Sequence, residues 1–476
     1  MKLLRNKTKI VATLGPATSS KEVMRELIEN GVNVFRLNFS HGKHDDVAEQ
    51  IKLIRELDHE MNTFTAVLAD LQGPKIRIGE VEGGGVMIEN GQELKITTNE
   101  QVGNKEKVYL NYGEFPNDVH PGEQIVIDDG KLVLEIIDTD RKSEVLTRVV
   151  HGGMLSSRKG VNLPNTRISL PCLTAKDLTD LEFILTQDVD WLALSFVREP
   201  DDIKELSGLI KKTGKDVKII AKIEKPQAVQ NLDGIIEETD GVMVARGDLG
   251  VEIPMQEVPL IQKKIVRKCQ RAAKPVIIAT QMMESMIENI APTRAEVNDV
   301  ANAVLDGADA VMLSGETSVG KFPVEVIKNI YKIILEVEGH DDIYYKEFEP
   351  EFEQSRFISD NICFSAVRVS KRAGAKGIAT MTFSGYTAYK ISSFRPKSDV
   401  FVFTGNVKLL NKMSLVWGTR AFYYDKFVST DQTIDDIKLE LKEKGHLNKN
   451  DLIINIASMP IADKGMSNML RLSKVE

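Results

Sequence analysis

Two carboxylates of this chain lie where a hard metal ion would bind. Glu224 comes just after the apolar run Lys218–Lys222, and Asp248 comes just after the run Gly241–Ala245. If these runs are neighbouring parallel strands, their carboxyl ends meet at one edge, so both side chains can reach one ion. Carboxylate oxygens suit Mg²⁺ or Mn²⁺. A pair of exposed acids is the alternative interpretation.

Lys222 precedes Glu224 by two positions. Alternate residues of a strand point to the same side, so the two side chains are expected to share a face. A lysine beside a metal-held phosphate carries the charge of a group in transfer or acts as an acid. An ordinary ion pair would explain the same spacing.

Arg36, Asn38 and Ser40 are also spaced by two positions, at the end of the run Val32–Leu37. If the extended backbone continues, all three side chains face one way. An arginine there grips phosphate through paired hydrogen bonds, and the amide and the hydroxyl add contacts. His41 marks the turn that follows, where a lone histidine is more often structural.

Further polar residues follow other apolar runs. Thr280 ends one of them, where its hydroxyl would relay a proton or simply cap the strand. Gly73 opens a Gly-Pro pair that resembles a hinge, although a plain turn is the alternative. Arg77 and Lys159 lie near the two ends of the segment beyond that hinge, where basic residues would face an anionic ligand or only solvent.

Eight apolar runs without strict alternation supply the elements that must place these side chains. Such runs are typical of parallel strands buried on both faces, and helix-like charged segments follow most of them. Eight repeats predict an α/β fold, a closed (β/α)8 TIM barrel with its chemistry at the carboxyl ends of the strands. The runs are Lys9–Leu14, Val32–Leu37, Thr65–Ala69, Trp191–Ser195, Lys218–Lys222, Gly241–Ala245, Pro275–Thr280 and Ala308–Leu313.

The pattern changes between the third and fourth runs. Short alternating segments separated by Asn-Gly, Pro-Gly and Asp-Gly turns predict a small inserted all-β domain. An insertion at the catalytic face of a barrel is well placed to act as a lid. We therefore divide the chain into a first barrel part (1–72), an inserted β-barrel lid domain (73–170), a second barrel part (171–340) and a C-terminal open α/β regulatory domain (355–476).

In the C-terminal domain, residues 382–387 join a predicted strand to a predicted helix. Thr382, Ser384 and Thr387 supply hydroxyls and Gly385 supplies a flexible backbone. Hydroxyls and a glycine at a helix N-terminus suit a phosphate group. A plain helix cap explains the same residues equally well.

Composition excludes several classes of protein. The chain has 476 residues and a net charge of −8, which argues against general binding of nucleic acid. No apolar run approaches the ~20 residues of a membrane span. The three cysteines are far apart, which favours buried thiols in a reducing compartment. We expect a cytoplasmic protein.

Together these clusters resemble the pyruvate kinase family. The stretches that carry the resemblance are RLNFSHG at 36–42, KIEKPQAV at 222–229, VMVARGDLGVEIP at 242–254, KPVIIATQMMESM at 274–286 and APTRAEVNDVANAVLDGADAVMLSGET at 291–317. The match covers the whole chain in order. It implies transfer of a phosphoryl group from phosphoenolpyruvate to ADP, giving pyruvate and ATP in the last step of glycolysis.

The resemblance also implies roles for single residues. Glu224 and Asp248 would hold Mg²⁺, Lys222 would stabilise the phosphoryl group in transfer, and Thr280 would help to deliver a proton. Arg36 and Arg77 would bind the phosphoryl group. The implied substrate-binding positions are Arg36, Lys222, Ala245, Arg246, Gly247, Asp248 and Thr280, and the implied nucleotide-binding positions are Thr13, Pro16, Asn38, His41, Arg77 and Lys159.

The chain departs from the family members that need K⁺. Those members carry a glutamate at the position of Lys75, so we expect K⁺ not to be required, with the lysine ammonium as its surrogate. A vestigial K⁺ site is still expected from Asn38, Ser40, Asp70 and Leu71.

The resemblance further implies a homotetramer and a phosphorylated effector bound at residues 382–387. The chain lacks the Gly- and Thr-rich C-terminal loop of activator-binding members. The identity of the effector is therefore open. The alternative function is a catalytically dead sensor of a sugar phosphate or nucleotide with the same fold.

Overall fold

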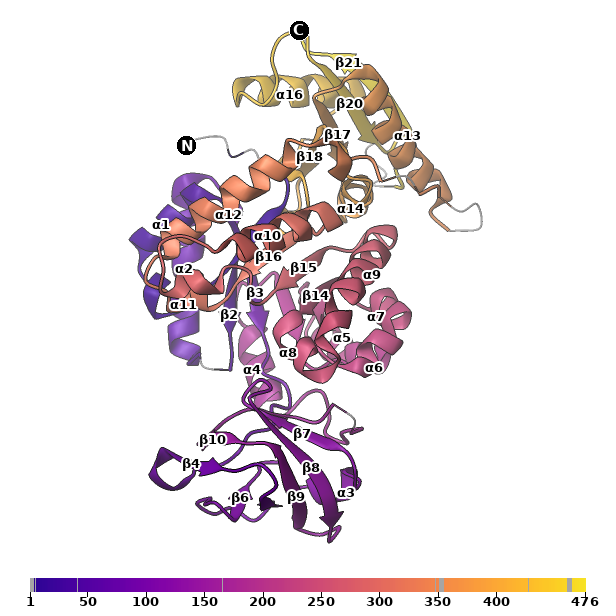
Figure 1. Cartoon of the computed structure of the whole chain (residues 1–476). Coiled ribbons are helices and arrows are strands. Elements are labelled where there is room, and N and C mark those ends of the chain that lie inside the picture. The colour runs from indigo at the N-terminus through magenta and orange to yellow at the C-terminus, as the bar shows by residue number, and fades with distance from the viewer. Residues whose placement is uncertain are drawn as a thin grey trace.

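A closed barrel of eight parallel strands forms the middle of the molecule (Figure 1). The computed structural model describes residues 4, 6–40, 42–164, 166–346, 348–350, 355–426, 428–459 and 465–476. The strands lie in the order β1-β16-β15-β14-β13-β12-β3-β2 around the barrel. They are β1 (Lys9–Thr13), β2 (Val32–Asn38), β3 (Ala66–Asp70), β12 (Trp191–Leu194), β13 (Lys218–Ile223), β14 (Gly241–Ala245), β15 (Val276–Ala279) and β16 (Ala310–Leu313). All eight predicted runs are confirmed as barrel strands.

The strands are apolar throughout because both of their faces are buried. On β1, Val11 packs inside the barrel with Trp191 and Ile220, while its neighbours Ile10 and Ala12 pack outward against the helices. Burial on both sides removes the alternation that marks a strand with one wet face. The predicted fold class is therefore confirmed at its centre.

Helices surround the barrel and connect its strands. The longer ones are α1 (Lys21–Asn30), α2 (His44–Met61), α4 (Ala175–Ile184), α5 (Pro200–Lys212), α9 (Val258–Arg271), α10 (Arg294–Asp306) and α12 (Pro323–Glu338). The short ones are α6 (Pro226–Gln230), α7 (Leu232–Glu238), α8 (Arg246–Glu252) and α11 (Gly315–Ser318). Thr174 caps α4, since its hydroxyl accepts a hydrogen bond from the Asp177 amide.

The inserted segment folds as mainly antiparallel sheet with its own apolar core, and of its described strands only the β5–β6 pair is parallel. Its larger sheet has the order β11-β7-β8-β9-β5-β6, and β10 pairs with β4 in a second sheet. Single bridges from Arg77 to Gly160 and from Ile78 to Leu110 tie the incoming chain to both ends of the larger sheet. The elements are β4 (Gly85–Ile88), β5 (Glu93–Thr97), β6 (Lys107–Tyr109), α3 (Phe115–Asp118), β7 (Gln124–Ile127), β8 (Leu132–Thr139), β9 (Glu144–His151), β10 (Gly153–Ser156) and β11 (Val161–Asn162).

The C-terminal part forms a five-stranded sheet in the order β19-β18-β17-β20-β21. The strands are β17 (Gly377–Met381), β18 (Asp399–Thr404), β19 (Thr419–Tyr423), β20 (Leu452–Ala457) and β21 (Met469–Lys474), with helices α13 (Phe357–Ala373), α14 (Tyr386–Ser393), α15 (Val407–Met413) and α16 (Thr430–Glu443). The first four strands are parallel, and β21 is antiparallel to β20. The sequence did not lead us to expect β21.

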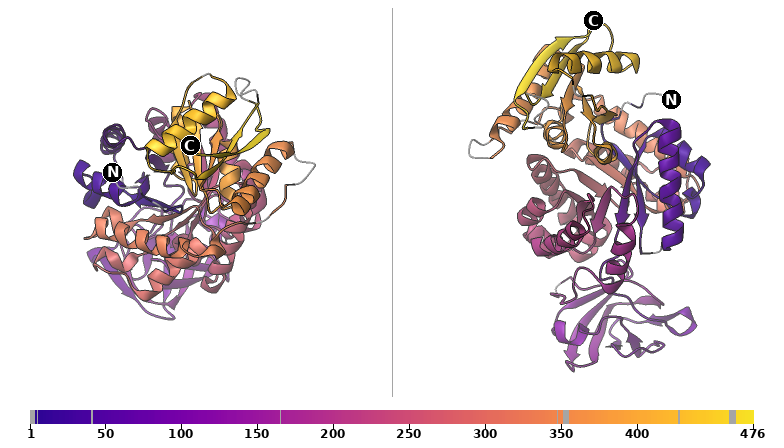
Figure 2. Two further views of the ribbon diagram at one scale, coloured as in Figure 1. Left: turned by 90° about the horizontal axis from the view of Figure 1, so that it is seen from above. Right: turned by 180° about the vertical axis from the view of Figure 1, so that it is seen from behind.

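The inserted and C-terminal parts lie at opposite ends of the barrel (Figures 1 and 2). The insertion follows the carboxyl end of β3, whereas Lys9 at the start of β1 donates to the Thr419 carbonyl of the C-terminal sheet. Every described helix is too short or too polar to cross a membrane. The three cysteines are free and buried.

Candidate active site

Asp70 stands at the centre of a charged cluster at the carboxyl ends of four barrel strands. One of its oxygens accepts from Arg36 Nε of β2 at 2.6 Å, and the other lies 3.2 Å from Lys222 Nζ of β13. Burial alone would raise the pKa of Asp70, but the charges of Arg36 and Lys222 outweigh it and hold this pKa below its ordinary value. The carboxylate therefore stays ionised and fixes two cations side by side.

Lys222 makes three polar contacts with its ammonium. Besides Asp70, its Nζ donates to Ser195 Oγ at 2.7 Å and pairs with Glu224 Oε1 at 2.9 Å. The predicted shared face of Lys222 and Glu224 is thus confirmed. Burial would lower the pKa of Lys222, but Asp70 and Glu224 raise it well above its ordinary value. The lysine is a permanent positive charge here, so it is unsuited to giving up a proton.

Glu224 and Asp248 belong to this same cluster. Burial raises the pKa of Glu224; Lys222 opposes the shift and the negative charge of Asp248 adds to it. The second oxygen of Glu224 accepts from the backbone N–H of Phe196 at 2.8 Å. Asp248 lies in the first turn of α8 and is half-buried.

The charges of the cluster fit a divalent cation. Two cations, Arg36 and Lys222, face the three carboxylates Asp70, Glu224 and Asp248. Without a metal the cluster has one excess negative charge, which would repel a polyanionic substrate. In the part of the chain that the structure describes, no group of three or more His, Cys, Asp and Glu side chains is placed to bind a metal. The predicted ligands, Glu224 and Asp248, are a pair and would leave the other coordination positions of the ion open.

Thr280 and Gly247 approach each other at the ends of β15 and β14. The Thr280 hydroxyl accepts from Gly247 N at 2.7 Å and donates to the Ala279 carbonyl at 2.6 Å. Thr280 has a φ of +69°, which is unusual for a β-branched residue and is typical of functional positions. A Cβ at position 247 would lie 3.3 Å from the threonine oxygen, so glycine permits this approach.

The Arg246 side chain braces the wall of the site. Its two terminal nitrogens lie 2.6 and 2.7 Å from the carboxylate of Asp299, and one also donates to the Thr280 carbonyl at 2.7 Å. A guanidinium held in this way is not free to grip a substrate. The predicted substrate contact at Ala245, Arg246 and Gly247 is through their backbone groups, which this side-chain pairing leaves untouched.

The predicted nucleotide-binding residues are only partly brought together. Thr13 Oγ1 accepts from Arg36 Nη1 at 3.1 Å, so it adjoins the charged cluster. Pro16 is exposed at the start of a short 3₁₀ turn. His41 lies outside the described residues. Asn38 Oδ1 accepts from the Ser40 amide at 3.1 Å.

Arg77 and Lys159 contact other groups of the inserted domain. Arg77 Nη1 donates to the Arg158 carbonyl at 3.2 Å, and Lys159 pairs with Asp128 at 2.9 Å. The contacts of the described residues do not link either side chain to the charged cluster. Their predicted contacts with substrate phosphates therefore stay predictions.

A cleft of about 970 Å³ separates the inserted domain from the barrel mouth. Its lining includes Lys75 and Asp129 on one side and Gly247 and Asp248 on the other. Lys75 thus faces the space beside Asp248. The predicted vestigial K⁺ ligands are already engaged, since both Asp70 oxygens are bonded and the Leu71 carbonyl accepts from Ser195 Oγ at 2.7 Å.

Ser195 and Phe196 are site residues that the sequence did not lead us to single out. Both follow β12, in the stretch LSFVRE; Ser195 contacts the predicted catalytic residue Lys222, and Phe196 contacts the predicted metal ligand Glu224. The rule that chemistry lies at strand ends would have found them, because β12 is a barrel strand like the others.

The chain enters the inserted domain at a constrained glycine. Gly73 has a φ of +68°, and a Cβ there would lie 2.7 Å from the Phe196 ring. Its amide donates to Asp177 Oδ1 of α4 at 3.1 Å. Asp177 also accepts from Thr174 N at 2.9 Å. One carboxylate therefore binds the chain segment that enters the insertion and the segment that returns from it.

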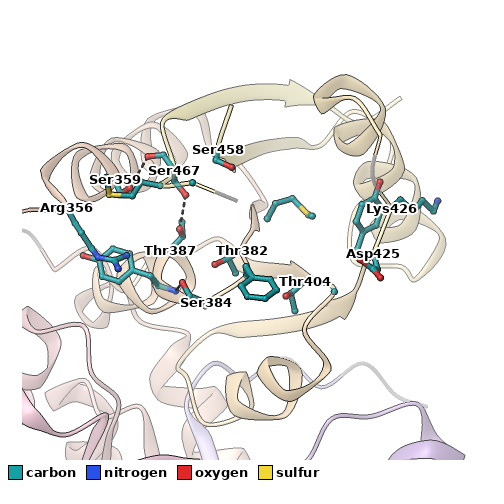
Figure 3. A pocket seen from close by; sticks show the side chains of 17 residues that line it. Arg356, Ser359, Thr382, Ser384, Thr387, Thr404, Asp425, Lys426, Ser458 and Ser467 are labelled. Atoms are coloured by element: carbon teal, nitrogen blue, oxygen red, sulfur yellow. Dashed lines mark hydrogen bonds between the residues drawn. The ribbon is translucent and has the colours of Figure 1, made fainter. Parts of the chain in front are cut away.

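The predicted effector loop lines a separate pocket of about 650 Å³ in the C-terminal part (Figure 3). Thr382 Oγ1 accepts from the Gly385 amide at 3.0 Å, and Thr387 bonds Ser467 at 2.8 Å. Ser384 lines the pocket beside them, and Lys426 lies across it. The pocket joins the predicted loop to residues near the C-terminus.

Comparisons with known proteins match two long parts of the chain to one family. The model of the pyruvate kinase barrel domain matches residues 5–327, and the model of the pyruvate kinase alpha/beta domain matches residues 360–473. The chain is 43% identical to pyruvate kinase 2 of Synechocystis sp. over 99% of its own length and 80% of that protein. It is 41% identical to pyruvate kinase of Corynebacterium glutamicum, with 98% and 96% covered.

A solved structure agrees with these matches. The crystal structure of a pyruvate kinase from Cryptosporidium parvum superposes with a TM-score of 0.92 at 33% identity. The superposition covers 99% of this chain and 96% of that one. The likeness therefore extends through the barrel, the insertion and the C-terminal part.

Proposed function

The chain belongs to the pyruvate kinase family, and from that membership we propose how its barrel mouth performs the reaction. The protein is a phosphotransferase that moves the phosphoryl group of phosphoenolpyruvate to ADP, giving pyruvate and ATP. The observation that carries our assignment of the site is the cluster of Arg36, Asp70, Lys222 and Glu224 at the strand ends.

Arg36 and Lys222 bind the phosphoryl group of phosphoenolpyruvate. Arg36 donates from Nε to Asp70 and from Nη1 to Thr13. Its Nη2 has no hydrogen-bond partner among the described residues. That nitrogen is available to a phosphate oxygen. Lys222 lies on the other side of Asp70 and places its ammonium charge near the same group. Positioning and charge neutralisation are the main work of phosphoryl transfer.

The transfer itself balances without a covalent enzyme intermediate. A β-phosphate oxygen of ADP attacks phosphorus, and the bond from phosphorus to the enol oxygen breaks. The electron pair stays on the enol oxygen, which leaves the enolate of pyruvate. A proton must then reach the methylene carbon. Thr280 helps to deliver this proton, because its hydroxyl is held between Gly247 and Ala279 at the end of β15.

Glu224 and Asp248 would hold a Mg²⁺ or Mn²⁺ ion. Such an ion neutralises charge on phosphoryl and enolate oxygens when it is bound. The support for this proposal is the excess negative charge of the cluster, in which the charge of Asp248 acts on the buried Glu224. A divalent cation compensates both carboxylates at once.

Lys75 replaces the monovalent cation that some family members need. Its side chain lines the cleft that Asp248 also lines, so its ammonium adds positive charge where two anionic substrates meet. Among the vestigial K⁺ ligands, oxygens of Asn38, Asp70 and Leu71 already accept hydrogen bonds within the protein. We propose turnover without K⁺.

Thr382, Ser384, Gly385 and Thr387 bind a phosphorylated effector in the C-terminal pocket. The hydroxyls line the pocket at the start of α14, where backbone N–H groups attract an anion. Mutating Thr382, Ser384 and Thr387 together to alanine should abolish activation in a screen of sugar phosphates and nucleotides. Activation that survives the triple change would place the effector site elsewhere.

Assembly into a homotetramer completes the proposal, together with the cytoplasmic location expected of a glycolytic enzyme. The support for this assembly is the likeness to the pyruvate kinase family, which implies a homotetramer. Sedimentation that gives only a monomer would contradict this assembly.

A coupled assay tests the proposed function against the catalytically dead sensor. Phosphoenolpyruvate, ADP and Mg²⁺ are supplied, and lactate dehydrogenase reports pyruvate through NADH oxidation. We expect steady pyruvate formation that depends on both substrates. No pyruvate under any tested effector would favour the sensor.

A further inference from the structure

We infer that Asn162, Lys225 and Glu252 form a latch that links the position of the inserted domain to the affinity of the site for a divalent cation. This inference rests on the proposed metal site at Glu224 and Asp248. Glu252 and Lys225 then act as positioning residues for the metal ligands.

One hydrogen bond of the latch joins the inserted domain to the barrel. Asn162 Nδ2 donates to Glu252 Oε1 at 2.7 Å. Asn162 is fixed within the inserted domain, because its strand β11 pairs with β7, with Asn162 opposite Val126. A movement of that domain therefore carries the Asn162 amide toward or away from Glu252.

On the barrel side, Glu252 connects the two segments that carry the metal ligands. It is the last residue of α8 and lies four positions after Asp248, so the two side chains share one face of the helix. Its Oε1 also pairs with Lys225 Nζ at 2.6 Å. Lys225 directly follows Glu224. The ion pair thus ties the end of β13 to α8.

A second set of contacts links Lys225 to Glu224 through Phe196. The Lys225 ammonium lies 5.6 Å from the centre of the Phe196 ring, and the Phe196 amide donates to Glu224 Oε2. Asn162, Phe196, Lys225 and Asp248 also line one small cavity beneath the inserted domain. The latch and the metal ligands are therefore in continuous contact.

The burial of Glu252 makes this arrangement sensitive to the domain position. Glu252 is 4% exposed, and its Oε2 has no hydrogen-bond partner in the described structure. All compensation of the carboxylate therefore comes from Asn162 and Lys225 through Oε1. Loss of the Asn162 bond would leave Lys225 as the sole partner and free the end of α8 to shift.

Linkage then makes the effect reciprocal. If formation of the Asn162–Glu252 hydrogen bond tightens cation binding by a given factor, cation binding must favour formation of that bond by the same factor. This coupling can be measured without turnover, through cation affinity and through amide exchange in the inserted domain.

The test compares Asn162→Ala with a matched control. Asn117→Ala removes a hydrogen bond from Asn117 Nδ2 to Glu114, 3.0 Å long, on the exposed surface of the same domain. Mn²⁺ binding is measured by the electron paramagnetic resonance of free Mn²⁺, with and without phosphoenolpyruvate. Hydrogen exchange of residues 159–163 is followed in the same samples.

We expect Asn162→Ala to raise the Mn²⁺ Kd by about fivefold, the lower end of typical coupling. It should also remove the slowing of exchange that Mn²⁺ and phosphoenolpyruvate produce together in the wild type. Glu252→Gln keeps an acceptor for Asn162 but loses the ion pair with Lys225, so its Mn²⁺ affinity should also fall. Asn117→Ala should match the wild type in both measurements.

Wild-type Mn²⁺ affinity and wild-type exchange in Asn162→Ala would overturn the latch alone. A different result separates the premise from the inference. Mn²⁺ binding that is absent from the wild type, or that is unchanged in Glu224→Ala, would overturn the metal site and the latch with it.

Discussion

Replacing Lys222 with methionine removes a positive charge from the centre of the site while keeping an unbranched side chain. An ammonium about 4 Å from a phosphoryl oxygen contributes about 4 kcal/mol at an effective dielectric constant of about 20. Because each 1.36 kcal/mol is a factor of ten in rate, we expect kcat to fall by about 10³. The KM values should change less, since the charge acts mainly on the group in transfer.

The fold should survive this substitution. Asp70 keeps its 2.6 Å ion pair with Arg36, and Glu224 keeps the Phe196 amide. Glu224 also takes up a proton readily, because burial already raises its pKa. Loss of the Lys222 charge therefore does not leave both Asp70 and Glu224 as buried carboxylates without a compensating partner.

Lys218→Met is the matched control for Lys222→Met. Lys218 begins the same strand and pairs with Asp240 at 2.9 Å, at the opposite end of the barrel. Its side chain is 35% exposed, so this pair is worth little to stability. Pyruvate formation at saturating Mg²⁺ and substrates gives kcat, and thermal unfolding reports the fold. A kcat for Lys222→Met within tenfold of the wild type would refute a catalytic role.

Three further perturbations test other parts of the site and the fold. Glu224→Ala or Asp248→Ala should raise the half-saturating Mg²⁺ concentration at least tenfold, since each removes one of two carboxylates; an unchanged titration would oppose the assignment. Wild-type turnover should persist with tetramethylammonium as the only monovalent cation, and Lys75→Glu should introduce K⁺ dependence; a ~100-fold loss in the wild type (~2.7 kcal/mol) would contradict this. Burial lowers the pKa of Lys9 to about 7, so between pH 7 and 9 the unfolded chain binds more protons there than the folded chain. The free energy of unfolding of the wild type should therefore rise relative to Lys9→Met by up to about 1.4 kcal/mol per pH unit, and equal slopes in denaturant titrations would exclude the effect.

The barrel was predictable from the sequence because burial on both faces forces continuous apolar strands. The strand-end rule then placed Glu224 and Asp248 in one site, and the two-residue spacing placed Lys222 beside Glu224. These features follow from the local periodicity of a strand and from the geometry of a parallel barrel.

Other features depended on partners far away in the chain. The Arg246 guanidinium binds Asp299, and the contacts of Lys222 include Ser195. Neither partner has a fixed spacing from its arginine or lysine, so no local pattern reveals it. Strand β21 was missed for a related reason, since an edge strand with polar residues such as Arg471 is only partly buried.

The position of the inserted domain also lies beyond local patterns. Turn signals indicated an all-β insertion, but they say nothing of where Arg77 and Lys159 point. In the structure both contact groups of their own domain. Their distance from the substrate is set by contacts across the cleft, which no local pattern predicts.

Phosphorus NMR of the reacting mixture tests the central claim most directly. Wild-type protein is mixed with phosphoenolpyruvate, ADP and Mg²⁺, and the phosphorus signals are followed with time. The signal of phosphoenolpyruvate should decline as the γ-phosphate signal of ATP grows by the same amount, and Lys222→Met should slow both by about 10³. Loss of phosphoenolpyruvate with release of inorganic phosphate, or no change in the wild type, would contradict phosphoryl transfer at this site.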